Sequence, residues 1–402
     1  MDVTATKLHD PSVYERGVPH EAFDELRRVS PVYWQPEQPP GRGFWALTRY
    51  DDVVAVSRDP ETFSSHLGTP LLADFDDEVI ALQRAMMISM DPPDHTRLRN
   101  IVNRGFTPRV VGRLEERIRR TCRSIVDAAL SRNEVDFVNE ISAPFPIAVI
   151  AELMGVPEHD RERLYDWSNR MIGFDDPEFQ VPGSDGVLAA AEMFAYASEL
   201  AGRRRADPRD DIVSKLVQPG PDRDLLTELE FNMFFVLLVI AGNETTRNAA
   251  SGGMQAMLEH PDQWHVLTAD RSAMRTAVEE ILRWVSPVMD FRRTATRDTE
   301  IGGEQIREGD KVILFYPAAN RDESVFEDPH VFDVRRDPNP HVAFGGGGPH
   351  FCLGAHLARL ELRVLFETLA ERTPGIRAAG PVRRLRSNFI NGVKEMPVRL
   401  CA

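Results

Sequence analysis

A cysteine that follows a run of glycines is the part of this sequence best suited to chemistry. Residues 344–354 read Phe-Gly-Gly-Gly-Gly-Pro-His-Phe-Cys-Leu-Gly, and a helix is expected to begin near Leu353. Glycines permit positive φ and let a backbone approach something flat and close. The N–H groups and the dipole at a helix N-terminus favour a thiolate at Cys352. His350, two residues earlier, adds a possible positive charge or hydrogen-bond donor.

Other kinds of site fit this loop less well. A phosphate-binding loop needs Lys and then Ser or Thr after the glycines, where Pro349 and His350 stand, and the pattern G-x-G-x-x-G cannot be laid on the run. Zinc would lack a fourth ligand beside Cys352, His350 and His356. A buried structural cysteine is the usual default for a lone Cys. A thiolate ligand to haem iron accounts for the sulfur, the glycines and the helix start together.

Two helical segments carry charged residues at informative spacings. Glu280 and Arg283 lie one turn apart, where a carboxylate can accept two guanidinium hydrogen bonds, although such pairs are usually solvated. Glu244 and Thr245 follow the apolar run 233–242, with Asn243 between them and the run. A buried Glu244 would need a partner or a function. Alternatively the helix emerges into solvent at this point, and the residues alone favour neither interpretation.

The elements that must position these residues are mostly helical. Helices are predicted at 93–105, 109–131, 145–154, 160–172, 187–204, 227–258, 273–286 and 353–372. A hairpin is predicted over 31–34 and 43–48, and strands at 291–296, 298–301, 304–306 and 311–316. Because strands and helices do not alternate, we expect one mainly α (α+β) domain over residues 1–402, with about a dozen helices and small β-sheets.

Composition narrows the class of protein and its location. The chain has 402 residues, 42% of them hydrophobic, and a formal net charge of −15. This acidic balance argues against nucleic acid or an anionic membrane as a partner. Three cysteines cannot form a disulfide framework, so a reducing compartment is expected. The N-terminus has no signal-peptide pattern, and the longest apolar run is too short to span a bilayer. We therefore expect a cytoplasmic protein with no membrane anchor.

Taken together, the motifs resemble those of the cytochromes P-450, and in particular of bacterial soluble members. The resemblance rests on the loop 344–354, on Glu280 and Arg283, on the Glu244–Thr245 pair, and on 91–99, Asp-Pro-Pro-Asp-His-Thr-Arg-Leu-Arg. It runs from about residue 30 to the C-terminus, and the motifs occur in the family's order. The interval from Phe344 to Cys352 is one residue longer than the commonest bacterial spacing. Bacterial relatives that resemble sterol and branched-lipid hydroxylases share this longer loop.

The resemblance implies haem b as the cofactor and a role for each motif. Cys352 would be the iron ligand, and haem contacts are implied at His95, Arg99, Ala241, Gly242, Arg293, Phe344, Gly345, His350, Cys352 and Gly354. Glu244 would relay protons and Thr245 would hold dioxygen or water, with Thr246 as the substitute if the register differs by one. Glu280 and Arg283 would be structural and hold the cysteine loop. Arg336 or Arg335 would be their third partner.

A substrate pocket can be placed only by position along the chain. The expected pocket residues are Leu67, Met86, Met87, Phe235, Leu238, Val288, Phe291 and Phe389. They are apolar, so we expect an apolar small-molecule substrate, although core packing would explain each residue singly. The resemblance narrows the substrate to a terpenoid, a steroid or a branched lipid.

The activity implied by the resemblance is hydroxylation with O2. Electrons must come from outside, because the chain has no flavin or nicotinamide fingerprint. A ferredoxin and its reductase are the expected donors, docking near Arg97, Arg104, Arg109, Arg359 and Arg363. We expect a monomer. The alternatives are a hydroxylase of a carrier-protein-bound substrate, a peroxygenase that uses hydrogen peroxide, and a non-enzymatic haem-binding protein with a degenerate site. Peroxygenases of the family usually lack the acid–alcohol pair.

Overall fold

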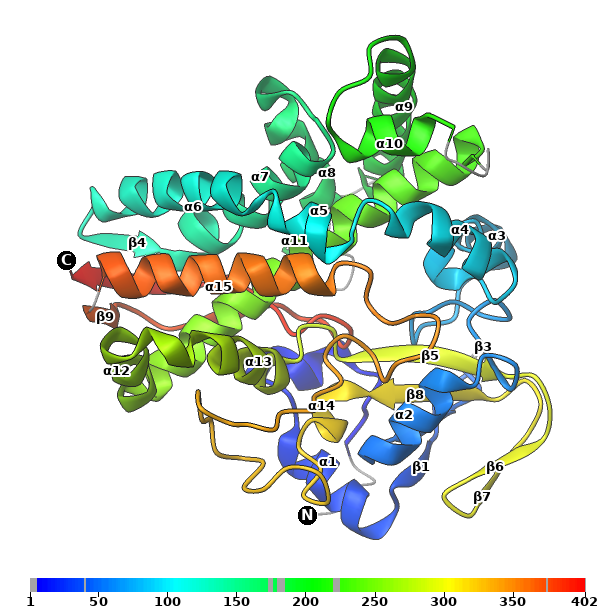
Figure 1. The fold of residues 1–402 in the computed structure, drawn as a ribbon. Coiled ribbons are helices and arrows are strands. Elements are labelled where there is room, and N and C mark those ends of the chain that lie inside the picture. Colours follow the sequence, from blue (N-terminus) through cyan, green and yellow to red (C-terminus); the bar gives the residue numbers. More distant parts are fainter. Residues whose placement is uncertain are drawn as a thin grey trace.

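Helices dominate the structure, a computed structural model that describes residues 6–39, 41–172, 176–178, 185–219, 225–373 and 375–401. A β-sheet with α1 and α2 occupies one side and most of the helices the other (Figure 1). The helices are α1 (His20–Val29), α2 (Tyr50–Arg58), α3 (Asp77–Gln83), α4 (Asp94–Asn103), α5 (Pro108–Gly112), α6 (Glu115–Leu130), α7 (Pro144–Leu153), α8 (Arg161–Ile172), α9 (Asp185–Ala206), α10 (Ile212–Val217), α11 (Glu228–Glu259), α12 (Pro261–Ala269), α13 (Met274–Val285), α14 (Tyr316–Ala319) and α15 (Ala355–Arg372).

The predicted helices occur with shifted ends, and one of them is divided. The helix expected over 109–131 is two helices, α5 and α6. Arg113 and Leu114 between them have ψ of −18° and −13°, which is closer to 3₁₀ than to α geometry. Helices α1, α2, α3, α10, α12 and α14 were not predicted. Most of these are short, and packing against the rest of the molecule supports helices that could not persist alone.

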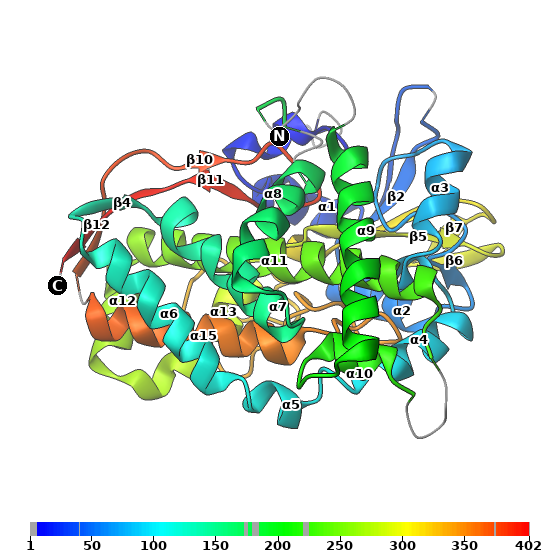
Figure 2. The ribbon, with the colours of Figure 1, turned by 90° about the horizontal axis from the view of Figure 1, so that it is seen from above.

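The longest helix, α11, runs through the centre of the molecule, and α7, α8 and α9 lie across it (Figure 2). It begins with a capping box in which Thr227 and Glu230 satisfy each other's backbone N–H groups. Its apolar start is buried as predicted: Phe234, Phe235 and Val239 are at most 5% exposed. Within the described part of the chain, no helix combines the length and the apolar character needed to cross a membrane.

The principal sheet has five strands in the order β1-β2-β8-β5-β3. They are β1 (Val32–Gln35), β2 (Phe44–Leu47), β8 (Lys311–Phe315), β5 (Asp290–Ala295) and β3 (Phe63–Ser64). The predicted hairpin β1–β2 is antiparallel, and β2 then pairs parallel with β8. The hairpin β6 (Thr299–Ile301) and β7 (Glu304–Ile306) is also as predicted. The sheet therefore joins segments from both halves of the chain.

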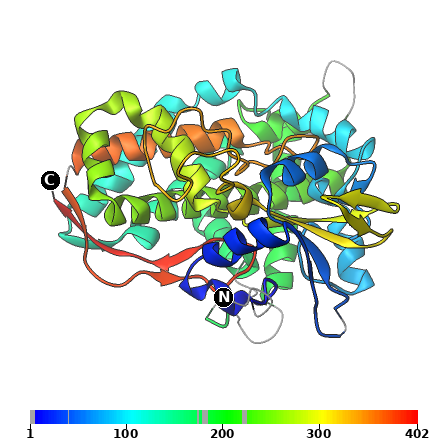
Figure 3. The same ribbon diagram turned by 90° about the horizontal axis from the view of Figure 1, so that it is seen from below.

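The C-terminal strands were not predicted. Two of them, β12 (Pro397–Cys401) and β9 (Gly375–Ala378), form a sheet with β4 (Glu134–Asp136) in the order β4-β12-β9. The other two, β10 (Arg383–Arg384) and β11 (Val393–Glu395), pair with each other. The chain of β10 and β11 extends from the C-terminal end of the molecule toward α1 and the N-terminus (Figure 3). There the Asn388 side chain donates to the carbonyl of His9 at 2.7 Å. The segment between β10 and β11 thus contacts the N-terminal segment, whereas the C-terminal end lies at the far side of the helical part (Figure 3).

Three helices, α11, α13 and α15, pack closely against one another at Gly253. A Cβ added at Gly253 of α11 would stand 2.6 Å from Ile281 of α13 and 3.1 Å from Phe366 of α15. Only glycine permits this crossing. Helix α13 ends at Ser286, whose φ of +45° is left-handed, and Pro287 prevents continuation. The chain can then turn into β5 beside the loop.

Candidate functional site

Cys352 lies directly before α15, and Gly354 is the N-cap residue of that helix. The Cys352 N–H donates to the carbonyl of Phe344 at 2.9 Å, which closes the glycine loop on itself. Burial raises the pKa of the Cys352 thiol. The backbone N–H of Gly354 and the cations Arg99 and Arg359 act in the opposite direction and favour the thiolate. The partly buried thiol therefore lies among groups that would stabilise its ionised form.

The glycines before Cys352 have two structural purposes. Gly345, Gly347 and Gly348 have φ of +95°, +95° and +73°, which other residues rarely adopt. A Cβ at Gly346 would stand 2.7 Å from the hydroxyl of Ser57 in α2, and one at Gly348 would stand 2.3 Å from the Ser57 carbonyl oxygen. The loop therefore needs glycine for its turns and for its packing on α2.

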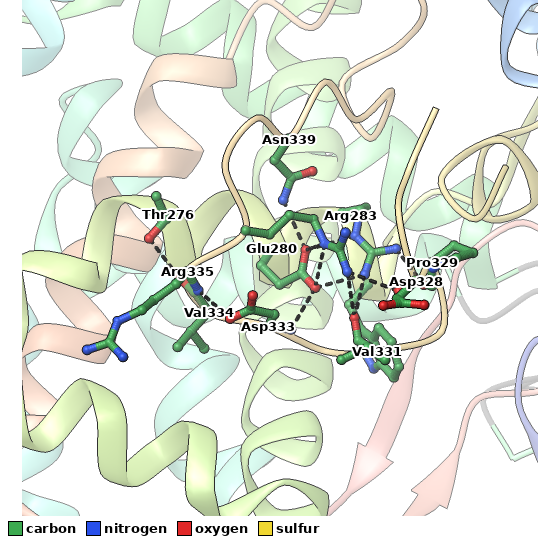
Figure 4. Close-up of polar contacts among 12 residues, drawn as sticks. Thr276, Glu280, Arg283, Asp328, Pro329, Val331, Asp333, Val334, Arg335 and Asn339 are labelled. Atoms are coloured by element: carbon green, nitrogen blue, oxygen red, sulfur yellow. Dashed lines mark hydrogen bonds and ion pairs between the residues drawn. The ribbon is translucent and has the colours of Figure 1, made fainter. Parts of the chain in front are cut away.

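Glu280 and Arg283 of α13 form a fully buried ion pair, with two N–O distances of 2.8 Å (Figure 4). The Arg283 guanidinium also donates hydrogen bonds to backbone carbonyls of the segment after α14, at Asn320, Pro329 and Val331. Glu280 also accepts a hydrogen bond from the N–H of Asp333 at 2.9 Å. The pair thus holds the irregular segment that leads into the cysteine loop.

The third partner of this pair is Arg336. Its Nε lies 3.2 Å from Oε2 of Glu280. Arg335 turns the other way and pairs with Asp270 at the surface, at 3.3 Å. Sequence alone left these two arginines open, because adjacent residues in an irregular segment can point to either side.

Glu279, the neighbour of Glu280, secures the loop from the other side. It accepts two hydrogen bonds from Arg359 of α15, at 2.8 and 2.9 Å, and lies 3.0 Å from Nε2 of His341. Burial alone would raise the pKa of Glu279, but the hydrogen bonds from His341 and Arg359 lower it to about 2. The Arg359 guanidinium lies 4.4 Å from the centre of the Phe344 ring. Sequence reasoning missed Glu279, since an acid on an amphipathic helix normally faces solvent.

Four basic residues converge beside the loop. The rings of His95 and His350 are 4.3 Å apart, and Ser65 Oγ lies 3.1 Å from Nε2 of His350. Arg99 donates to the carbonyl of Phe351 at 2.7 Å. Arg293 is 5% exposed, and its Nη1 donates to a backbone carbonyl at 2.8 Å. Three segments far apart in the chain supply this cluster: α4 carries His95 and Arg99, β5 carries Arg293, and the glycine loop carries His350.

The cluster has the character of an anion site. Burial, followed by neighbouring cations, lowers the pKa of His350 to about 2 and that of His95 to about 4. His95 Nδ1 is buried without a hydrogen-bond partner in the described part of the chain. Within the described residues, neither Arg99 nor Arg293 forms an ion pair with a carboxylate. A group carrying two carboxylates, such as haem with its propionates, fits this unbalanced positive charge.

Glu244 is buried, which resolves the question left open by the sequence. Its side chain lies 3.1 Å from Nη1 of Arg247 and 3.3 Å from Nδ2 of Asn248. Arg247 is itself only 8% exposed, so the helix does not emerge into solvent here. The Thr245 hydroxyl donates to the carbonyl of Ala241 at 2.7 Å. This contact bends a helix locally and keeps the hydroxyl on the Ala241 face.

Ala241 and Gly242 differ in what they face. Ala241 is exposed in the middle of an otherwise buried helix. Gly242, which is predicted to contact haem, is half-buried and also packs closely against α7. A Cβ at Gly242 would stand 2.6 Å from Cδ1 of Ile150 in α7. The small residue at 242 permits the crossing of α7 and α11, and Ala241 alone keeps the face toward Thr245 small.

The expected pocket residues are brought together only in part. The rings of Phe291 and Phe389 are 5.6 Å apart, and Val288 pairs with the neighbour of Phe389, Ile390. Leu238, Met86 and Met87 belong to or pack against the largest apolar cluster. Leu67 is 49% exposed.

Phe235 does not belong with these pocket residues. It is fully buried, and its ring packs 6.1 Å from Tyr196 of α9. Residues 235 and 241 are six apart, which places them on different faces of one helix. Phe235 is therefore part of the helical core and not of the face that carries Ala241.

Comparison with known proteins agrees with this geometry. A family model described as Cytochrome P450 matches residues 195–372. A Rhodococcus jostii steroid C26-monooxygenase is 45% identical over 397 residues, which cover 97% of this chain and 83% of the relative. A Mycobacterium tuberculosis methyl-branched lipid omega-hydroxylase is 44% identical, over 94% of this chain and 90% of the relative. A Mycobacterium marinum cytochrome P450, solved in complex with pseudoionone, has a TM-score of 0.89 and 41% identity, covering 95% of this chain and 94% of that chain.

The fold and the site define a haem-thiolate monooxygenase, and the chain belongs to the cytochrome P450 family. Haem b is its cofactor. The predictions of family, mainly α fold, cofactor and class of enzyme are confirmed.

Proposed function

We propose that this enzyme hydroxylates the terminal methyl group of a branched aliphatic chain, carried by a steroid or a methyl-branched lipid. One observation carries the proposal: relatives named for steroid C26 and for the omega carbon of a methyl-branched lipid are almost equally similar to this chain. Carbon 26 ends the branched side chain of a steroid, so both reactions act on the same kind of carbon. The apolar wall of Val288, Phe291 and Phe389 suits such a chain end.

The residues around the loop are suited to hold haem. Cys352 would bind the iron through its sulfur. Arg99 and Arg293 would neutralise the two propionates, His95 and His350 would offer hydrogen bonds to them, and Ala241 would leave room for the ring. Phe344, Gly345 and Gly354 would shape the loop around the thiolate. Haem bound in this way supplies the activation of dioxygen.

Glu244 and Thr245 would deliver the protons. Hydroxylation consumes O2, two electrons and two protons, and releases one water. The Thr245 hydroxyl lies on the Ala241 face and can hold a proton there after rotation about χ1. Glu244 can supply that proton only if its carboxylate exchanges the hydrogen bonds from Arg247 and Asn248 for one to the relay. Thr246 is buried and remains the substitute.

A ferredoxin would donate the electrons, and α5 would be part of its docking surface. Three of the five arginines expected there are paired with acids: Arg97 with Glu230, Arg359 with Glu279 and Arg363 with Glu115. Arg109 of α5 and Arg113, which directly follows this helix, are exposed and, in the described part of the chain, form no ion pair. Helix α5 packs against α15, which begins just after Cys352. These two cations would face an acidic partner close to the thiolate.

The test is the carbon-monoxide difference spectrum of the dithionite-reduced protein, followed by titration of the ferric protein with steroids and methyl-branched lipids. We expect a thiolate-type Soret band, a high-spin shift with both classes, and a terminal alcohol as the product with ferredoxin and reductase. Steroids without a side chain are the matched control and should not be hydroxylated at a terminal methyl. Hydroxylation only on the steroid ring would contradict the proposal. Turnover with hydrogen peroxide but none with ferredoxin would instead establish a peroxygenase.

A further inference from the structure

Two asparagines of α11 make the same contact at two levels of the helix. Asn243 Nδ2 donates to Ser168 Oγ of α8 at 3.0 Å, and Asn232 Nδ2 donates to Ser198 Oγ of α9 at 2.7 Å. They are eleven residues apart, or about three turns, and therefore share one face. Both Oδ1 atoms are buried without a hydrogen-bond partner within the described residues.

The hydrogen-bonded pair of Asn243 and Ser168 is energetically unfavourable at a helix interface. Asn243 and Ser168 are both 0% exposed. A buried amide that satisfies only part of its hydrogen-bonding capacity destabilises the fold relative to an apolar side chain of similar size. Packing alone therefore does not explain the pair. What the pair offers is one defined position of α8 relative to α11.

That position matters because Asn243 directly precedes Glu244 and Thr245 in the chain. Successive residues of a helix are about 100° apart, so Asn243 and Ala241 lie on nearly opposite faces of α11. On the Ala241 face, the Thr245 hydroxyl bonds to the Ala241 carbonyl, which makes this turn easier to bend. On the opposite face, the hydrogen bond from Asn243 to Ser168 attaches the same turn to α8.

We propose that Asn243 is a positioning residue for proton delivery. Its hydrogen bond to Ser168 fixes the turn of α11 at 241–245 and thereby the placement of Glu244 and Thr245. Asn232 makes an equivalent bond but lies three turns away from the acid–alcohol pair, so it stabilises the helices without this effect. The inference rests on the proposed roles of Glu244 and Thr245.

The test measures how the holoenzyme divides its oxygen between products. Formation of peroxide uses two electrons and two protons per O2, and formation of water uses four of each. Hydroxylation uses two of each and releases one water. The haem-loaded protein, with a surrogate ferredoxin and reductase, is assayed for oxygen, reductant and peroxide, with cholesterol as the probe and also without it. The variants are Asn243→Ala, Ser168→Ala, Asn232→Ala as the matched control, and Thr245→Ala as the reference.

We expect Asn243→Ala and Ser168→Ala to raise the share of oxygen released as peroxide about fivefold, the size of a typical coupling between packed groups. Asn232→Ala should lower the melting temperature about as much as Asn243→Ala does. It should leave the peroxide share unchanged. Exchanging the two residues, Asn243→Ser with Ser168→Asn, should restore the parent peroxide share. If Asn243→Ala fails to load haem, Ser168→Ala tests the same bond from α8.

Three results separate the possible failures. Equal peroxide shares in Asn243→Ala and Asn232→Ala, with a raised share in Thr245→Ala, overturn the role of Asn243 alone. An unchanged share in Thr245→Ala overturns the proposed proton relay and this inference with it. Failure of the parent to hydroxylate cholesterol counts against the proposed substrate class only, because the division between peroxide and water without substrate still tests Asn243.

Discussion

Asp290, at the start of β5, is a buried carboxylate of a kind that proteins rarely keep. It is 0% exposed, and neither of its oxygens has a hydrogen-bond partner among the described residues. Burial raises the pKa of Asp290 well above its ordinary value. Its side chain also raises the pKa of the buried Tyr14, after the larger effect of burial. The uncharged form of Asp290 is therefore the one that suits the folded protein.

Replacing Asp290 by Asn should stabilise the protein at neutral pH. The unfolded chain loses this proton near pH 4, whereas the folded protein holds it to higher pH. Between the two pKa values the folded state binds more protons, so the parent loses stability as pH rises. We expect Asp290→Asn to gain about 2 kcal/mol at pH 8 and little near pH 4. Thermal unfolding at several pH values measures this, and a gain independent of pH would contradict it.

Cys352 can be tested against another cysteine of the same chain. Cys352→Ala should abolish the thiolate-type band of the carbon-monoxide difference spectrum, because no other sulfur lies in the glycine loop. Cys401→Ala, on β12, makes the same chemical change far from the loop along the chain and should leave the band intact. If the band persisted in Cys352→Ala, the assignment of the iron ligand would be wrong.

At the scale of elements, α13 connects the helices to the cysteine loop through Glu280 and Arg283. Removing one partner of a buried pair leaves the other charge uncompensated. Glu280→Gln should therefore cost about 4 kcal/mol of stability and weaken haem retention, since Arg283 and Arg336 would both lose their acid. Chemical denaturation and the haem-to-protein absorbance ratio measure the two effects.

The matched control is Arg335→Gln in the same segment. Arg335 is 58% exposed at its side chain and pairs with Asp270 at the surface. Loss of this ion pair should lower the free energy of unfolding by no more than about 0.5 kcal/mol. Similar losses of stability in both variants would mean that the segment is sensitive to any change of charge. The buried ion pair would then contribute no more to stability than a surface pair.

At the scale of the whole molecule, the net charge of −15 makes the basic residues near the loop stand out. Arg109→Glu should raise the KM for a ferredoxin about fivefold at low salt, with kcat unchanged, because a charge at the rim of an interface acts mainly on association. The difference should fade as the salt concentration rises. Arg307→Glu changes the net charge equally but follows β7, away from α5 (Figure 1), and should leave the KM unchanged. If both variants raised the KM equally, the net charge of the protein would explain the change without a docking surface at α5.

The apolar wall also belongs to the molecule as a whole, because Phe291 and Phe389 come from segments about a hundred residues apart. Phe389→Ala should weaken the binding of a steroid or branched lipid about tenfold, as expected for the loss of a buried aromatic contact. The ferric spin shift measures the affinity. Val29→Ala, at the exposed end of α1, is the control. Unchanged affinity in Phe389→Ala would place the substrate elsewhere.

The sequence by itself determined the features whose parts lie close together in the chain. The glycine loop before Cys352, the turn that joins Glu280 to Arg283 and the apolar start of α11 are local patterns, and each is explained by backbone geometry or helix periodicity. These patterns also carried the resemblance to the P-450 family, and with it the fold class and the cofactor. Short strands and helices escaped prediction because their support comes from distant segments.

Only the tertiary structure distinguished between residues that the local sequence pattern could not tell apart. It chose Arg336 over Arg335, assigned Gly242 to the crossing with α7, and turned Phe235 into the core beside α9. It also paired Arg359 with Glu279 and brought four basic residues from three segments to one place. The physical reason is the same in each case: a side chain's direction and partners depend on which distant elements pack against it, and local spacing does not contain that information.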